Sequence, residues 1–224
     1  MKNLFKNNAA FYLPYLIFVI VGAILILKTE QFALHTKFNS IVGNSFLDFF
    51  FKYSTHIGDG LFLILIAIVL FFFNFKNAIF LLISYALAGG FTQFLKKVFF
   101  NFEMRPFFHH TFNGLPLKVV EGVQMYSQNS FPSGHSTSAF CLFFCLCIIS
   151  PKVWQKIFFF CLAILIGFSR VYLSQHFFED IYVGSIIGVG FSSIVAYIFF
   201  YSKFSFKLTK LEQSITKVFK KQNG

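Results

Sequence analysis

Charged residues are scarce in this chain of 224 residues, making up 12% of it, and only eight of them are acidic. Hydrophobic residues account for 57% of the sequence, and the mean hydropathy is +0.71. Soluble domains typically carry about 25% charged residues. The composition therefore excludes an ordinary soluble domain and predicts an integral membrane protein.

Cysteine is also sparse, and all four cysteines, Cys141, Cys145, Cys147 and Cys161, fall inside apolar stretches. A free cysteine in such a stretch behaves as a small hydrophobic residue. We therefore expect no disulfide, no metal site and no cofactor.

The net charge of +11 would suit nucleic-acid binding in a soluble protein. Here, however, the lysines flank apolar runs and collect near the C-terminus, as is typical of cytoplasmic segments facing anionic lipid headgroups. We expect the lipid bilayer, and no nucleic acid, as the partner of the chain. The oligomeric state stays open.

No small-residue cleavage motif follows the first apolar run, so we expect this run to be a retained transmembrane helix rather than a signal peptide. The whole chain is predicted to be one all-α membrane domain with six transmembrane helices. Between and after them we expect an interfacial segment at 28–57, a long polar loop at 101–131 and a basic cytoplasmic tail at 202–224. The predicted transmembrane helices are 10–27, 58–73, 78–100, 132–149, 153–173 and 177–201.

The distribution of positive charge predicts the orientation of these helices. Eleven lysines fall in the segments on the side of the N-terminus, against eight Lys or Arg on the other side. Four of those eight, Lys96, Lys97, Arg105 and Arg170, belong to the polar clusters described next, and setting them aside strengthens the bias. Because cytoplasmic loops are enriched in Lys and Arg, we expect the N-terminus inside and these clusters outside the cytoplasm.

The stretch Pro132-Ser133-Gly134-His135 stands where the polar loop ends and an apolar helix begins. The first backbone N–H groups of a helix attract anions, and a histidine beside them can donate a proton. Two further polar clusters, Lys96-Lys97 with Arg105 and the run 169–180, are predicted on the same membrane face. Their convergence indicates a phosphate-handling site.

These clusters resemble the signature of the type 2 phosphatidic acid phosphatase family over about residues 90 to 190. Two of its three blocks match: Pro132-Ser133-Gly134-His135, and Ser169-Arg170 followed at the required spacings by His176 and Asp180. The first block departs from the pattern, because the position that should hold lysine, with six residues between it and Arg105, is Val98.

The resemblance implies a haloperoxidase-like helical core and a metal-independent phosphatase site. His176 would attack phosphorus, Asp180 would hold it, and His135 would act as general acid and base. The implied phosphate-binding residues are Arg105, Arg170, Ser133, Gly134 and one lysine, for which we favour Lys97 over Lys96. The non-catalytic alternatives are a structural pair for His176 and Asp180 and a capping role for His135. The two arginines could instead reach toward lipid headgroups. The remaining polar residues near this face, His35, His56, Asp59, His109, His110 and Glu121, are read as ordinary loop or interfacial residues.

We therefore expect a lipid phosphate phosphatase of a bacterial inner membrane, with its active site facing the outside. Undecaprenyl diphosphate, phosphatidic acid, phosphatidylglycerophosphate and lipid A phosphate all fit as substrates. A lipid phosphotransferase with another acceptor than water, and a non-catalytic scaffold or transporter of the same fold, are the alternatives.

Overall fold

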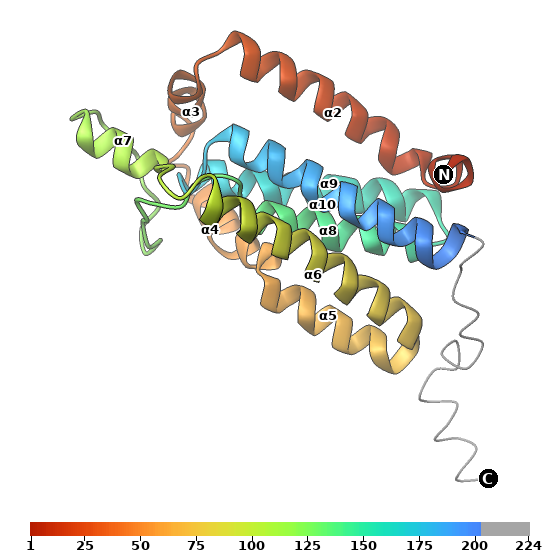
Figure 1. Ribbon diagram of the computed structural model, residues 1–224. Coiled ribbons are helices and arrows are strands. Elements are labelled where there is room, and N and C mark those ends of the chain that lie inside the picture. Colours follow the sequence, from red (N-terminus) through yellow and green to blue (C-terminus); the bar gives the residue numbers. More distant parts are fainter. Residues whose placement is uncertain (203–224) are drawn as a thin grey trace.

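The computed structural model describes residues 1–202, and the regular secondary structure of that part is helical, apart from one isolated bridge between Met104 and Gln128. The predicted basic tail thus lies outside the described residues, except for Ser202 at its start. The elements, shown in Figure 1, are α1 (Lys2–Asn7), α2 (Ala9–Lys28), α3 (Gln31–Asn39), α4 (Ser45–Ser54), the 3₁₀ helix η1 (Thr55–Gly58), α5 (Gly60–Phe73), α6 (Phe75–Val98), α7 (Pro106–Phe112), α8 (Gly134–Ile149), α9 (Val153–Tyr172), α10 (Phe178–Ala196) and the π-helical turn η2 (Tyr197–Tyr201).

The expected all-α membrane architecture is confirmed, whereas the count of six transmembrane helices is not. In the described part, α2, α6, α9 and α10 with η2 are each long and apolar enough to cross a membrane. A fifth span results if α4, η1 and α5 count as one broken span with a 58° bend. The remaining apolar helix, α8, has only 16 residues, or about 24 Å at 1.5 Å per residue.

Helix α8 lies at the centre of the bundle. It packs against α5, α6, α9 and α10, and its side chains Phe140, Cys141 and Phe144 are buried. Two glycines of α10 bring this helix unusually close: a Cβ on Gly184 would lie 2.7 Å from the backbone oxygen of Ser133, at the start of α8. A Cβ on Gly188 would meet the next turn of α8 at 2.6 Å, so only glycine permits this approach.

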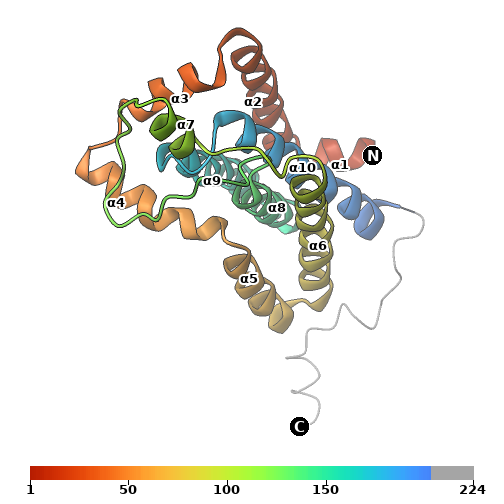
Figure 2. The ribbon, with the colours of Figure 1, turned by 60° about the vertical axis from the view of Figure 1, so that its left-hand side comes forward.

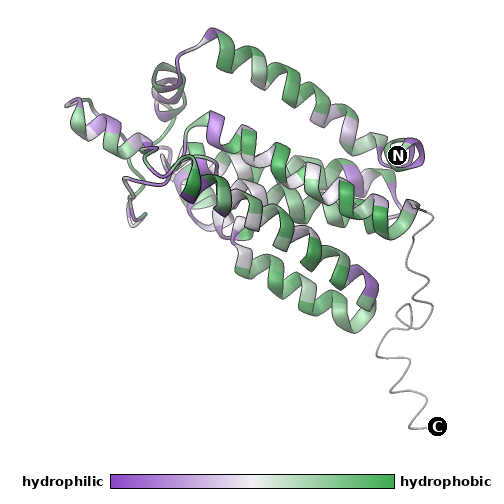
Figure 3. Cartoon of the chain, in the orientation of Figure 1, coloured by the Kyte–Doolittle hydropathy of each residue, from purple (hydrophilic) through white to green (hydrophobic). Residues whose placement is uncertain are grey.

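The outer helices turn apolar side chains away from the core. Leu13 and Ile17 of α2, and Leu61 and Phe73 of α5, are exposed, and the hydropathy colouring shows apolar residues along the length of the helices (Figure 3). Exposed apolar bands of this kind fit contact with lipid. Cys161 is exposed as well, whereas the other three cysteines are buried, and all four are free thiols.

Helices α3, α4 and α7 gather at one end of the bundle, opposite the end that holds the N-terminus and η2 (Figure 1). The segment between α7 and α8 runs past α4 and returns to the start of α8 (Figure 2). It is tied down on the way, since Lys52 of α4 donates a hydrogen bond to the backbone oxygen of Glu121 (2.6 Å). Residues 113–133, the larger part of the segment predicted as a polar loop, therefore pack over this end of the bundle and are called the cover below.

One interfacial residue is placed differently from our prediction. His35 of α3 was read as a solvated residue, but it is completely buried, and its Nδ1 lies 3.3 Å from Nε2 of His110 in α7. Burial lowers the pKa of His35 to about 4, and the neighbouring His110 contributes to this shift. The contact joins α3 to α7, so the interfacial helices are part of the packed structure at this end.

Candidate active site

His176 and Asp180 form a buried pair at the junction of α9 and α10. The Nδ1 atom of His176 lies 3.0 Å from Oδ2 of Asp180, and both side chains are almost completely buried. His176 precedes α10, and Asp180 reaches back to it from the third position of the helix. Since the carboxylate accepts a hydrogen from Nδ1, this assigns the lone pair of the neutral ring to Nε2.

The surroundings of His176 keep its ring neutral. Burial lowers the pKa of His176 well below its usual value, and the positive charges of Arg105, Arg170 and Lys96 lower it further. A low pKa leaves the imidazole uncharged at neutral pH. The histidine therefore combines a free lone pair with a cationic environment, which suits attack on an anionic electrophile.

Further donors fix the carboxylate of Asp180. Its Oδ2 atom also accepts hydrogen bonds from the hydroxyl of Ser130 (2.5 Å) and from the backbone N–H of Phe177 (3.0 Å). The contact with Ser130 anchors the end of the cover segment to α10. Our reading of the sequence assigned no role to Ser130, because its spacing from the signature residues follows no pattern.

Arg170 lies buried near the end of α9 and is oriented by a residue from the other half of the chain. Its Nη1 donates to the hydroxyl oxygen of Thr55 in η1 (3.1 Å), and Ser169 donates to the same oxygen (2.9 Å). Its Nε is buried without a hydrogen-bond partner among the described residues. Arg170 is thus fixed through Nη1, and its Nε–H remains free to donate a hydrogen bond to an anion. The role of Thr55 was also missed from the sequence.

Arg105 stands at the N-terminal cap of α7 and is held by backbone oxygens of two loops. Its Nε donates to the backbone oxygen of Gln128 (2.8 Å), and its Nη1 donates to that of Gln175 (3.0 Å). The guanidinium carbon lies 5.4 Å from the centre of the Tyr126 ring, in a cation–π contact. Gln175 directly precedes His176, so Arg105 links Gln128 of the cover to the chain beside the pair of His176 and Asp180.

Lys96, and not the favoured Lys97, lies with the other predicted cations of the site. Only 9% of Lys96 is exposed, and its Nζ donates to the backbone oxygen of Asn129 (2.7 Å). Lys97 is exposed, about 100° further around α6. The helix continues to Val98, and Lys96 lies one turn beyond the buried Thr92, which contacts Thr137 of α8 (3.0 Å).

The start of α8 brings the third motif to the same place. Ser133 is the N-cap of α8, and its hydroxyl accepts the backbone N–H of Ser136 (3.3 Å). The N–H of Ser133 donates to the backbone oxygen of Asp180 (3.0 Å), so it is not available to phosphate as predicted. Gly134 is the first residue of the helix, where N–H groups have no partner within the helix. Its N–H remains a candidate hydrogen-bond donor to a bound phosphate.

His135 follows in the first turn of α8 and contacts a carboxylate that we had read as an ordinary loop residue. Its Nε2 lies 2.5 Å from Oδ1 of Asp59, the residue between η1 and α5. Both side chains are about one-third exposed. The sequence offered a weak signal for this contact, the glycines on both sides of Asp59.

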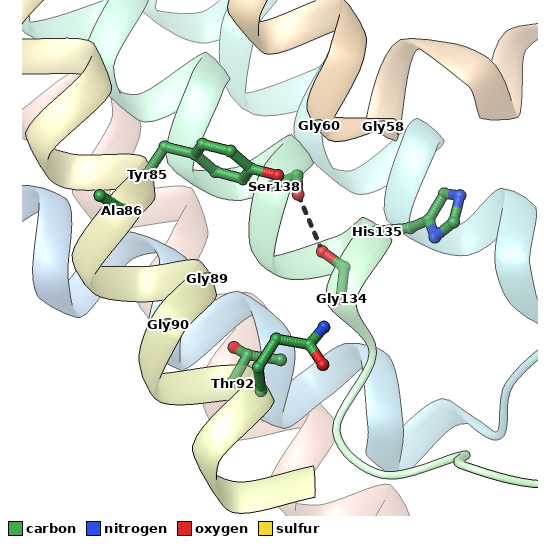
Figure 4. Close-up of a pocket in the computed structure, with 11 residues that line it drawn as sticks. Gly58, Gly60, Tyr85, Ala86, Gly89, Gly90, Thr92, Gly134, His135 and Ser138 are labelled. Atoms are coloured by element: carbon green, nitrogen blue, oxygen red, sulfur yellow. Dashed lines mark hydrogen bonds between the residues drawn. The ribbon is translucent and has the colours of Figure 1, made fainter. Parts of the chain in front are cut away.

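Two hollows meet at His135. One, of about 440 Å³, is lined by Thr55, Asp59, Tyr126, Arg170 and other polar residues. The second, of about 350 Å³, is lined mainly by small residues of η1, α5, α6 and α8, with His135 at its edge (Figure 4). A phosphate at this junction would therefore have a polar chamber on one side and a groove between helices on the other.

The structure thus brings together His176, Asp180, His135, Arg105, Arg170 and Gly134 from the predicted set and replaces Lys97 with Lys96. No three His, Cys, Asp or Glu side chains within residues 1–202 form a group that could hold a metal ion. A neutral histidine, three cations and a second histidine in one place can bind a phosphoryl group, accept it covalently and move a proton.

Comparison with known proteins agrees with this arrangement. The sequence pattern of the PAP2 superfamily matches residues 77–204, which is more than half of the chain. A lipid A 1-phosphatase of Rhizobium johnstonii is 34% identical over 79 residues, covering 35% of this chain. The chain spans only 32% of the length of that relative.

Two solved structures are also similar. LpxE of Aquifex aeolicus superposes with a TM-score of 0.65 at 28% identity, covering 76% of this chain and 97% of LpxE. A transmembrane PAP2 type phosphatidylglycerolphosphate phosphatase of Bacillus subtilis superposes with a TM-score of 0.62. This match covers 89% of this chain and 99% of the phosphatase, and its 22% identity makes it a likeness of fold alone. With the family match, the motifs and the membrane helices in agreement, this chain belongs to the PAP2 superfamily and is a multi-pass membrane protein.

Proposed function

We propose that this protein hydrolyses a phosphomonoester or diphosphate of a membrane lipid through a phosphohistidine intermediate. The observation that carries the proposal is the environment of His176, whose neutral ring is fixed by Asp180 and surrounded by Lys96, Arg105 and Arg170. Three cations can neutralise the charge that spreads over the phosphoryl oxygens in the transition state.

In the first step, Nε2 of His176 attacks phosphorus. The P–N bond forms as the bond between phosphorus and the leaving oxygen breaks, and protonated His135 gives its proton to that oxygen. Asp180 stabilises the charge that the phosphorylated ring acquires, by accepting its Nδ1 hydrogen. The products of this step are the dephosphorylated lipid and the phosphoenzyme.

In the second step, water replaces the nitrogen. Neutral His135 takes one proton from the water as the new P–O bond forms, the P–N bond breaks, and orthophosphate is released. Both histidines then return to their starting states. A lipid acceptor in place of water would make the protein a phosphotransferase, but no described residue favours that reading over hydrolysis.

Among lipid phosphates, we place lipid A phosphate first. The Rhizobium relative is a lipid A 1-phosphatase, and the chamber beside Arg170 carries Lys52, Gln124 and Tyr126, which can hydrogen-bond a polar headgroup. Undecaprenyl diphosphate, phosphatidic acid and phosphatidylglycerophosphate are the competing substrates. The charge bias of the loops supports a site on the outer side of a bacterial inner membrane.

The test is orthophosphate release from these four lipids by the purified full-length protein in detergent, with EDTA present. We expect release from lipid A phosphate to be fastest, and no release by His176→Ala with any of the lipids. Rapid quenching should trap an acid-labile phosphohistidine in His135→Ala with an aryl phosphate, since that leaving group needs no proton. Label on any residue other than His176, or activity that depends on added metal, would overturn the mechanism.

A further inference from the structure

His135 is held by a carboxylate that does not belong to the signature motifs of the family. Asp59 comes from the junction of η1 and α5, far from His135 in the sequence, and its Oδ1 lies 2.5 Å from Nε2 of the ring. The other carboxylate oxygen, Oδ2, lies 3.0 Å from Nδ1 of His56. Asp59 thus contacts one histidine with each oxygen.

The chain at Asp59 is shaped for close approach to α8. A Cβ on Gly58 would lie 3.3 Å from the backbone oxygen of His135 and 3.0 Å from Ile166, closer than most side chains tolerate. A Cβ on Gly60 would overlap the hydroxyl of Tyr85 in α6. Figure 4 shows both glycines beside the start of α8, from which His135 projects. The glycines on either side therefore let Asp59 reach the ring.

Asp59 also gives up the role that its position suggests. It is the N-cap of α5, yet its side chain makes no hydrogen bond to the backbone of that helix. An aspartate at an N-cap normally accepts a backbone N–H there and stabilises the helix. Here the carboxylate is turned to the histidines, which indicates that the contact with His135 determines its orientation.

We propose that Asp59 is a positioning residue for His135. By accepting a hydrogen bond from Nε2–H, it fixes the tautomer in which Nδ1 is the atom that exchanges a proton with the leaving oxygen and with water. The site then contains two His–carboxylate pairs of opposite sense. In the pair of His176 and Asp180, Nδ1 is bonded to the carboxylate and Nε2 is free, whereas in the pair of His135 and Asp59, Nε2 is bonded.

The positions of the two pairs suit their different tasks. His176 is almost completely buried, with 1% of its surface exposed, so its ring meets little water. His135 is partly exposed and borders both hollows, so it can meet a leaving group and later a water molecule. Asp59 would keep its ring aimed at phosphorus through both steps.

This inference rests on the proposed function, and the test distinguishes the two. The variants are Asp59→Asn and, as a matched control, His56→Ala, which removes the exposed partner of the same carboxylate. Each is assayed with the lipid phosphate that the wild type hydrolyses fastest and with p-nitrophenyl phosphate, by steady-state kinetics and by rapid quench for phosphoenzyme.

We expect Asp59→Asn to lower kcat for the lipid by about 10- to 100-fold, a part of the ~10²–10⁴-fold that general acid–base catalysis supplies. The KM for the lipid should stay within about twofold, because Asp59 acts through His135 and not on the substrate. Phosphoenzyme formation from p-nitrophenyl phosphate should change little, while its hydrolysis slows. A purely structural role would lower both steps and both substrates alike. His56→Ala should keep the leaving-group dependence of the wild type.

Equal losses in the rate of phosphoenzyme formation with both substrates, or full activity of Asp59→Asn while His135→Ala is inactive, would overturn the role of Asp59 and leave the proposed function intact. Undiminished phosphate release by His176→Ala would instead overturn the proposed function. A fluorescence-detected thermal transition of Asp59→Asn within a few degrees of the wild type checks that the fold is preserved.

Discussion

The assignment of Lys96 to the site can be tested against its neighbour Lys97, because the two lysines have the same chemistry and opposite surroundings. Lys96 is buried, and its charge acts on Arg105, Arg170 and Asp180, whereas Lys97 is exposed. The matched variants are Lys96→Gln and Lys97→Gln. Both variants remove one positive charge and put a neutral amide donor in its place.

The magnitude follows from the position of Lys96 within the cluster of cations. Removing one fixed donor that stabilises transition-state charge costs about 10²- to 10³-fold in kcat, or ~2.7–4 kcal/mol. We expect a loss in this range for Lys96→Gln. A surface substitution changes stability by about 0.5 kcal/mol or less, so Lys97→Gln should remain within about twofold of the wild type in kcat/KM.

The assay is orthophosphate release in detergent over a range of lipid concentrations, with the folded fraction measured by size-exclusion chromatography. Lys96 also holds the backbone oxygen of Asn129, so Lys96→Arg serves to separate charge from loop anchoring and should recover part of the activity. A large loss in Lys97→Gln, with Lys96→Gln close to wild type, would show that α6 presents the opposite face to the substrate.

Three further predictions concern packing, pH and orientation. Gly184→Ala should destabilise the protein by about 1–3 kcal/mol and lower the melting temperature, because its Cβ would lie 2.7 Å from the Ser133 oxygen. The control Gly190→Ala, whose Cβ would meet open space, should melt like the wild type. Equal melting temperatures of the two variants would contradict the close packing at Gly184. Burial lowers the pKa of His176 well below 6.5, and only the neutral ring attacks. With p-nitrophenyl phosphate, whose leaving group needs no proton, phosphoenzyme formation should therefore keep its full rate as the pH falls through 6.5 and decline only at lower pH; a decline centred at or above pH 6.5 would refute the neutral nucleophile. In intact spheroplasts, a cysteine at Gly114 should react with a membrane-impermeant thiol reagent and one at Asn77 should not, and the reverse pattern would refute the outward orientation.

The family, and most of the residues that gather at the candidate site, could be predicted from the sequence because their signals are local. The pair of His176 and Asp180 lies within one short stretch, and Ser133 to His135 marks a helix start by composition alone. Membrane character follows from the apolar composition in the same way. Where prediction failed locally, a signal was present: Ser84, Ala88, Thr92 and Lys96 recur every four residues on the buried face of α6, and that period favours Lys96.

The partners that orient the site residues were decided only by the tertiary structure. Thr55 meets Arg170, and Asp59 meets His135, because η1 packs against α8 and α9. Contacts between residues so far apart leave no periodic trace in a single sequence. His35 likewise looked solvated because its helix carries charged neighbours, and only the packing of α3 against α9, α10 and His110 of α7 buries it. Residue types and short spacings thus determined which groups carry the chemistry, while the close approach of helices, set by side-chain volume at glycines such as Gly58 and Gly184, determined how they are held.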